Sequence, residues 1–318
     1  MNKIFDKIRK RRVVRILSYI TKKFSFPGFE GVPIYNVLNF FSKEIKRDVI
    51  HIRAKAIAFS FFLAIVPSLI FVFSLIPYLP VPMLQDYLIE IVSEFIPNET
   101  FIMIEDTVTD VIANQRGGLL SLGFLIAVFF ATNGMSTMMD SFDKSNASFV
   151  NRKFLKSKWI ALKLTIILIF LFIATFVFVV TGNYFLNFLL NSMQIFNQLN
   201  FILFSILKWV IVICMFFISI SIIYYYGPSV RKRWRFISAG STLATILCLL
   251  ISLGFSYYVN NFGHYNVFYG SLGTIIVFLL WLYLNSLSMI LGFELNASIA
   301  YNRLMIDEKT KETPSEEV

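Results

Sequence analysis

Long apolar blocks constrain this chain more than any other feature, and Ile57–Pro77 and Gly270–Ile290 are two of them. Each one approaches or exceeds the roughly 20 residues that an α-helix needs to cross the hydrocarbon core of a bilayer. Charged residues make up only 15% of the sequence, against roughly 25% in an ordinary soluble domain. A single soluble core is therefore excluded, and the sequence predicts an all-α, polytopic integral membrane protein.

Hydropathy predicts six membrane-spanning helices. They run approximately over Ile57–Leu79, Leu119–Met139, Trp159–Thr181, Leu207–Tyr226, Phe236–Val259 and Gly270–Asn296. Almost every Lys and Arg lies in segments 1–56, 140–158, 227–235 and 297–318, whereas the loop between the first two spans is acidic. Because cytoplasmic loops carry an excess of basic residues, this pattern places both termini in the cytoplasm of a bacterial plasma-membrane protein.

The chain divides into a basic cytoplasmic arm (1–56), a transmembrane bundle (57–297) and a polar cytoplasmic tail (298–318). Within the arm, apolar residues recur every three or four positions from Ile34 to Ala56, which predicts an amphipathic helix along the inner membrane surface. The outer loop, about 80–117, shows the same periodicity in two stretches separated by Pro97, so it is expected to be helical.

The net charge of +10 has a membrane explanation. On the predicted topology, basic residues such as Arg11, Arg12, Arg231 and Arg233 lie at the inner surface, where anionic lipid head groups attract Lys and Arg. Membrane lipids are therefore the expected partners, and a nucleic-acid partner is not needed to explain the charge.

No constellation typical of an enzyme is present in the sequence. Cys214 and Cys248 lie inside apolar blocks, and His51 and His264 are far apart, so neither a disulfide framework nor a metal site is predicted. There is no Walker loop, no H-E-x-x-H and no G-x-S-x-G elbow. We therefore expect a protein without enzymatic activity and without a cofactor.

Polar residues inside the spans are the candidate functional residues, because a bilayer biases them toward the bundle interior. Glu294 heads this set, with Asn285 on roughly the same helix side, and Asn133 lies in the second span. Pro67 is expected to break the first span. We therefore predict that these four residues line a substrate-binding cavity. An equally good interpretation is that Glu294 lies at the membrane interface and pairs with a basic residue of a loop.

Glycines in the last two spans predict close helix packing. Gly254, Gly270, Gly273 and Gly292 would let neighbouring helices approach. The same residues are compatible with a homo-oligomer or with packing inside one bundle. Tyr224 falls at a predicted inner boundary and fits an aromatic belt.

Several short motifs resemble the YihY/BrkB family of bacterial inner-membrane proteins, over about residues 35 to 300. They are the segment Ala54–Pro67, then Tyr226-Gly227-Pro228 with Gly240, then Tyr269-Gly270-Ser271-Leu272-Gly273, and finally Leu291-Gly292-Phe293-Glu294-Leu295-Asn296. Lys55 and Ser60 depart from the family pattern in the first of these. The resemblance implies a six-span helical bundle with both termini inside, and it carries over no agreed catalytic residues.

Three functions follow as hypotheses. The leading one is ATP-independent transport or flipping of a lipid or other amphiphile, through a cavity near Pro67, Asn133, Asn285 and Glu294. The second is a non-catalytic envelope scaffold that binds other proteins. The third, a membrane-bound ribonuclease, is remote, because the predicted cytoplasmic segments lack a cluster of metal-binding carboxylates.

Overall fold

The computed structural model describes residues 28–45, 49–78, 114–143, 152–192, 198–229, 235–262 and 271–312, together with Ser25, Thr109 and Asp110. Its regular elements over these ranges are all helices. They are α3 (Ile34–Ile45), α4 (Val49–Leu75) with a short 3₁₀ extension (Ile76–Tyr78), α7 (Gly117–Asp143), α8 (Phe154–Ser192), α9 (Gln198–Tyr226), α10 (Ala239–Phe262) and α12 (Ser271–Glu312).

The prediction of an all-helical membrane protein is confirmed. Six of the described helices, α4, α7, α8, α9, α10 and α12, are long and apolar enough to cross a membrane. Each of them overlaps one predicted span. The outer loop that was expected to be helical lies outside the described residues except at its end, where residues 109–110 are helical.

One predicted helix boundary and one predicted helix break are wrong. The amphipathic helix expected to reach Ala56 ends at Ile45, and residues 49–56 instead form the start of α4. The predicted break at Pro67 is absent, because α4 continues through it. Pro67 cannot donate a backbone hydrogen bond to the carbonyl of Leu63, yet the helix continues for two more turns to Leu75. A single proline is therefore accommodated inside this helix.

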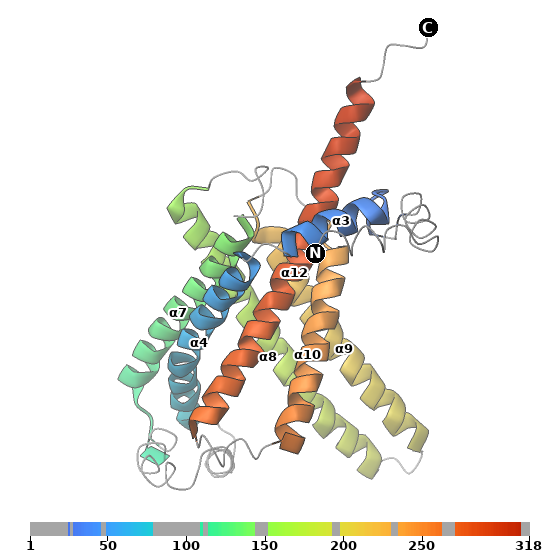
Figure 1. Ribbon diagram of the computed structural model, residues 1–318. Helices are drawn as coiled ribbons and strands as arrows, with labels where there is room; N and C mark the ends of the chain where they lie inside the picture. The colour runs from blue at the N-terminus through green and yellow to red at the C-terminus, as the bar shows by residue number, and fades with distance from the viewer. Residues whose placement is uncertain are drawn as a thin grey trace.

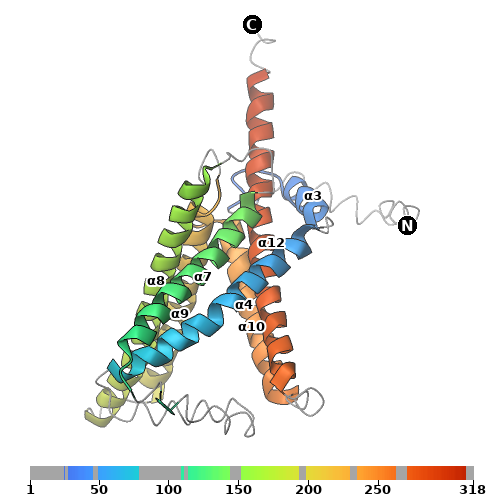
Figure 2. The ribbon, with the colours of Figure 1, turned by 90° about the vertical axis from the view of Figure 1, so that its left-hand side faces the viewer.

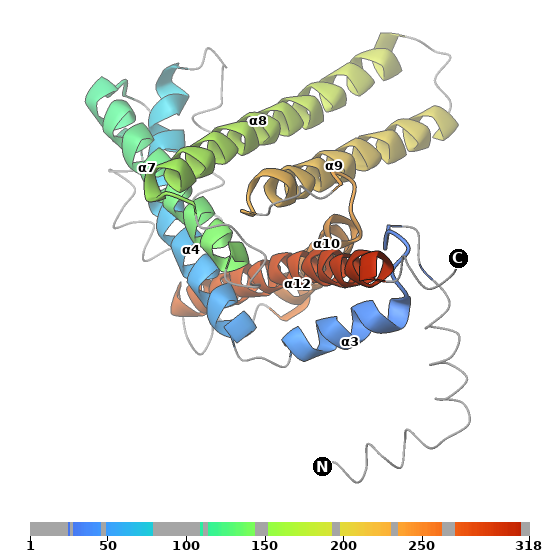
Figure 3. The same ribbon diagram turned by 90° about the horizontal axis from the view of Figure 1, so that it is seen from above.

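The six long helices form a closed ring of contacts. Around it, α4 contacts α7, α7 contacts α8, α8 contacts α9, α9 contacts α10, α10 contacts α12, and α12 returns to α4. In Figure 1 α4 lies beside α7 and α10 beside α12, and Figure 3 shows that α8 and α9 run together. The ring thus joins the first long helix to the last.

The two ends of the ring differ in packing. We call the end beside α3 the α3 end and the opposite one the far end; the helices lie close together at the α3 end and spread toward the far end (Figures 1 and 2). At the α3 end, α12 is buried from residue 286 to 299 except at Leu287 and Leu291. Toward the far end, no residue in 166–175, 206–219, 249–259 or 275–285 is buried.

Helix α3 is not part of the ring and packs against α12 from outside. Its Val37 packs with Val32, Leu295 and Ile299 in a small apolar cluster, and the backbone carbonyl of Val37 accepts a hydrogen bond from Ser298 at 3.0 Å. Beyond this contact, α12 continues past the other helices (Figure 1). The first residues of the predicted polar tail therefore extend the last span as a helix.

Candidate functional site at the α3 end

A buried ion pair lies between the first and last long helices. Arg53 of α4 places its Nη2 3.0 Å from Oε1 of Glu294 on α12, with side-chain exposures of 8% and 0%. Two charges in an apolar environment are stable only when they are paired and hydrogen-bonded. This pair therefore joins α4 to α12 at a point where either charge alone would be costly.

Arg53 also contacts α7. Its Nη1 donates a hydrogen bond of 2.8 Å to the backbone carbonyl of Ser141, in the last turn of α7, where carbonyls lack intrahelical partners and carry the negative end of the helix dipole. Its Nε is buried and has no hydrogen-bond partner among the described residues. One guanidinium thus holds three helices together and retains an unused donor.

An aromatic cluster is formed by residues next in sequence to these contacts, since Phe142 follows Ser141 and Phe293 precedes Glu294. The rings of Phe142 and Phe293 stack with centroids 4.3 Å apart, and Tyr224 meets Phe142 edge-on at 5.7 Å. The Tyr224 hydroxyl donates to the backbone carbonyl of Met289, and its side chain is buried. Tyr224 is therefore a core residue, which corrects its assignment to an aromatic belt at the membrane surface.

Helices α10 and α12 approach closely at two glycines. A Cβ added to Gly292 would lie 2.5 Å from the carbonyl oxygen of Gly240 and 2.7 Å from the Tyr224 hydroxyl. Beside this contact, the Asn296 side chain accepts a hydrogen bond from the Gly240 backbone N–H (2.8 Å) and donates one to Ser238 (2.9 Å). A residue of α12 therefore caps the first turn of α10.

The connection before α10 is fixed by two charged side chains. Arg152 donates from Nη1 to the carbonyl of Gly227 at 2.8 Å and from Nη2 to that of Pro228. Asp143, at the end of α7, accepts a hydrogen bond from the Ser229 N–H at 2.8 Å. The Gly227-Pro228-Ser229 segment is thus held by groups from both sides of the α7–α8 connection.

The structure describes separate surroundings for the four residues predicted to bind substrate. Glu294 is the buried partner of Arg53, whereas Asn285 donates to the carbonyl of Trp281 on its own helix at 2.9 Å. Asn133 accepts a hydrogen bond from Lys158 at 3.0 Å, and Pro67 is a half-buried residue inside α4. Their contact with a substrate stays a prediction.

The other predicted residues have different outcomes. Gly273 is buried and Gly292 lies at the α10–α12 contact. Gly254 is exposed, and no described atom lies within 4 Å of where its Cβ would be. The close packing expected at Gly254 is therefore wrong for the described chain, because this part of α10 has no neighbour at that face. Arg11, Arg12, Arg231, Arg233 and Gly270 lie outside the described residues.

Arg53 is the site residue that sequence reasoning missed. It was counted with the basic cytoplasmic arm, because positions 49–56 continue the amphipathic pattern of α3. Arg53 lies only four residues before Ile57, where the first apolar block begins. One additional helical turn at the start of the first span would therefore have placed Arg53 inside the membrane. An arginine there needs a carboxylate, and Glu294 is the acidic residue of the last span.

Metal binding has no support among the described residues, which contain no group of three or more His, Cys, Asp or Glu side chains close enough to hold an ion. The site is therefore an ion pair inside an aromatic and glycine-rich helix contact. Such an arrangement can hold the α3 end of the ring closed.

Comparison with known proteins identifies the family. A protein of Bacillus subtilis (strain 168) named as ribonuclease-like, YfkH, is 29% identical over 256 residues, which are 80% of this chain and 92% of that protein. A UPF0761 membrane protein of Tolumonas auensis is 36% identical over 81 residues, which are 26% of this chain and 27% of that protein.

A UPF0761 membrane protein of Xanthomonas oryzae pv. oryzae (strain PXO99A) is 39% identical over 84 residues, which are 26% of this chain and 20% of that protein. No solved structure matches. The model of the virulence factor BrkB family matches residues 41–317, so it includes the helices that form the ring. The chain therefore belongs to the BrkB family of membrane proteins.

Proposed function

We propose that this protein moves an amphiphile, such as a lipid, across the bacterial plasma membrane without ATP. The observation that carries the proposal is the contrast between the two ends of one closed ring of helices. At the α3 end, the Arg53–Glu294 pair and the aromatic cluster join several helices through buried contacts. Toward the far end, four of the six helices have long stretches without a buried residue.

The far end suits an amphiphile. In a packed bundle each helix buries a stripe of side chains along its whole length. Toward the far end, α8, α9, α10 and α12 have stretches without such buried side chains. The side chains that these stretches expose are mainly large and apolar, for example Phe172, Trp209 and Leu253. Acyl chains would be compatible with such a surface, and a polar head group would meet the charges of Arg53 and Glu294.

Transport requires that the α3 end also opens. The buried ion pair ties α4 to α12, and it can separate only when other polar groups replace its contacts. We therefore propose that the ion pair is the gate on the predicted cytoplasmic side, with both chain termini on that side. The surplus of Lys and Arg in the segments between the spans supports this orientation.

Lipid exchange in vesicles tests the proposal. Purified protein is reconstituted into phosphatidylethanolamine–phosphatidylglycerol vesicles that contain a trace of fluorescent lipid, and an impermeant quencher reports the lipid that reaches the outer leaflet. Vesicles with protein should lose nearly all the fluorescence, and protein-free vesicles about half. Equal loss in the two preparations would contradict the proposal for lipids.

Two variants test the gate. Glu294→Gln removes the negative charge and weakens closure, so the exchange rate should rise several-fold, whereas Arg53→Lys keeps a positive charge opposite Glu294 and should raise the rate less. Elution as a single peak in detergent shows that each variant is folded. Full wild-type exchange in folded Glu294→Gln protein would remove Glu294 from the mechanism while leaving the transport proposal intact.

A ribonuclease is the second candidate, because the relative YfkH is named as ribonuclease-like. The same purified protein, incubated with labelled RNA and Mg²⁺, tests it directly. RNA cleavage that follows the protein peak through two chromatographic steps would support this activity. Cleavage that separates from the protein peak would point to a contaminating nuclease.

A further inference from the structure

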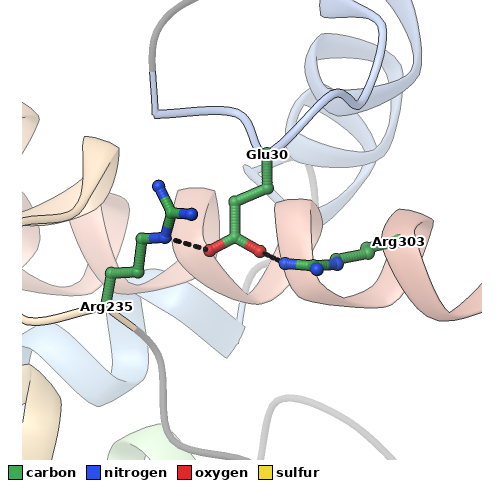
Figure 4. A network of polar contacts seen from close by, with 3 residues as sticks. All are labelled: Glu30, Arg235 and Arg303. Atoms are coloured by element: carbon green, nitrogen blue, oxygen red, sulfur yellow. Dashed lines mark hydrogen bonds and ion pairs between the residues drawn. The ribbon is translucent and has the colours of Figure 1, made fainter.

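A second charged group lies outside the ring, around Glu30. Figure 4 shows its carboxylate between two arginines, Arg235 from the segment before α10 and Arg303 from α12. Oε1 of Glu30 lies 3.5 Å from Arg235 Nε, and Oε2 accepts a hydrogen bond from Arg303 Nη1. Three segments far apart in the sequence therefore meet at one carboxylate.

The backbone of Glu30 is held in an unusual conformation. Its φ is +53°, in the left-handed region, and it is flanked by Gly28 and Gly31 with φ of +98° and +83°. A non-glycine residue in this region is uncommon and persists where surrounding contacts hold it. The turn thus directs the Glu30 carboxylate toward the two arginines.

The two guanidinium groups are only partly used by Glu30. Among the contacts that the structure describes, Arg235 uses only Nε and Arg303 only Nη1. A guanidinium can donate two parallel hydrogen bonds to one anion, and a phosphate offers more oxygens than a carboxylate. Two arginines that share one carboxylate would therefore form more hydrogen bonds with a phosphate group.

The position also favours a phosphate group. Arg235 is 74% exposed and Arg303 42% exposed, so both can be reached from outside. Glu30 and Arg235 also line a small open pocket, together with Ser238, Asn296 and Ile299. This pocket lies at the α3 end, which the charge distribution places at the inner membrane surface, where anionic lipid head groups are abundant.

We propose that Arg235 and Arg303 form a binding site for a phosphate group, that of an anionic lipid at the membrane surface, and that Glu30 is a built-in competitor for it. The Glu30 carboxylate occupies the arginines when no phosphate is bound. When a phosphate group binds, Glu30 is displaced and the 28–31 turn is released from α12. The site is separate from the Arg53–Glu294 pair and does not depend on transport.

Lipid binding by the full-length protein tests this site. The delipidated protein in detergent is titrated with phosphatidylglycerol, and native mass spectrometry measures the bound fraction, with diacylglycerol as the phosphate-free comparison. Glu30→Gln should raise the affinity for phosphatidylglycerol about three- to fivefold, the size expected for loss of a surface ion pair. The double change Arg235→Gln with Arg303→Gln should lower binding to the level of diacylglycerol.

A matched control is available at the far end. Asp110 and Arg116 form an exposed ion pair there, so Asp110→Asn removes an equivalent negative charge and should leave phosphatidylglycerol binding unchanged. A single elution peak for every variant excludes unfolding as the cause of a change. Unchanged or weaker binding by Glu30→Gln would overturn the proposal, and so would an equal gain in Asp110→Asn.

Competition with inorganic phosphate shows whether the bound phosphate group must belong to a lipid. Displacement of phosphatidylglycerol from the wild type by millimolar phosphate, together with loss of lipid binding in the double variant, would support a phosphate site that also accepts a free anion. Resistance to phosphate, together with loss of lipid binding in the double variant, would support a site that requires the lipid. Lipid binding that the double variant retains in full would overturn the assignment.

Discussion

The α3 end and the far end of the ring are built from the same six helices and differ in how their side chains are used. At the α3 end, charged, aromatic and glycine residues from α4, α7, α9, α10 and α12 meet in one core. At the far end, α4 and α7 remain in contact through Phe71, Gly123 and Phe124, whereas α8, α9, α10 and α12 have long stretches without a buried residue. Specific packing is therefore concentrated in one half of the membrane-spanning structure.

This difference indicates which end of the ring stabilises the fold and which end can open. A region with many buried contacts opens only at a large free-energy cost, whereas a region with few contacts opens easily. The α3 end would then hold the helices in register, and on the proposed function the far end would be the part that admits lipid. Substitutions matched in chemistry but placed at opposite ends are the direct way to test this division.

Removing an arginine from each end gives the largest expected contrast. Arg53→Ala leaves Glu294 buried without its ion-pair partner and should cost about 3–5 kcal/mol. Arg116→Ala breaks the exposed pair with Asp110 and should cost about 1 kcal/mol or less. The melting temperature of each detergent-solubilised variant, read from the soluble peak after heating, measures the difference. Equal losses at the two ends would contradict the comparison.

The same glycine substitution at two points of α10 gives the next contrast. A Cβ at Gly240 would lie 2.6 Å from Asn296 Oδ1 and closer still to the Gly292 carbonyl, whereas Gly254 has open space. Gly240→Ala should therefore cost about 1–3 kcal/mol through overpacking. Gly254→Ala should be neutral, or stabilise α10 by up to about 1 kcal/mol, because alanine favours a helix interior. Thermal melting of the two variants measures both effects, and a larger loss in Gly254→Ala would reverse the assignment of the packed end.

Two asparagines on α12 provide a smaller contrast. Asn296→Ala removes the cap on the first turn of α10 and should cost about 1–2 kcal/mol. Asn285→Ala removes only a hydrogen bond to its own helix and should change stability by about 0.5 kcal/mol or less. Hydrogen exchange of the Gly240 amide should also speed up in Asn296→Ala alone. Unchanged exchange there would mean that Asn296 does not cap α10 in solution.

The sequence predicted the membrane class and the six spans correctly, because apolar length is a local property that hydropathy reads directly. The site was predicted only through Glu294. Its partner Arg53 belongs to a different helix, and sequence periodicity along one segment cannot show which residues of distant segments meet. Even the boundary that hid Arg53 depended on tertiary packing, since the apolar pattern of α3 continues into α4 without a change of period.

The glycines show the same limit more sharply. Gly254 and Gly292 lie in apolar surroundings and looked equivalent in sequence, yet only Gly292 faces another helix closely. Nothing in the sequence apart from the family resemblance singled out Gly240 as the partner of Gly292. Tyr224 was misplaced for a related reason, because a tyrosine near a span boundary fits the membrane surface and the core equally well until the neighbouring helices are placed.

The smallest expected effect is at the far end, and it bears most directly on the proposed function. Leu253 is 68% exposed, so Leu253→Ala should change stability by about 0.5 kcal/mol or less. Ile290, fully buried at the α3 end, is its control, and Ile290→Ala should cost about 2–5 kcal/mol. Thermal melting compares the two. A loss of several kcal/mol in Leu253→Ala would mean that Leu253 is packed in the folded protein, which would leave less room for an acyl chain between the helices and remove the main support for transport. A neutral result would show that Leu253 is not packed in the folded protein, and the vesicle assay would then decide whether lipid crosses the membrane through the protein.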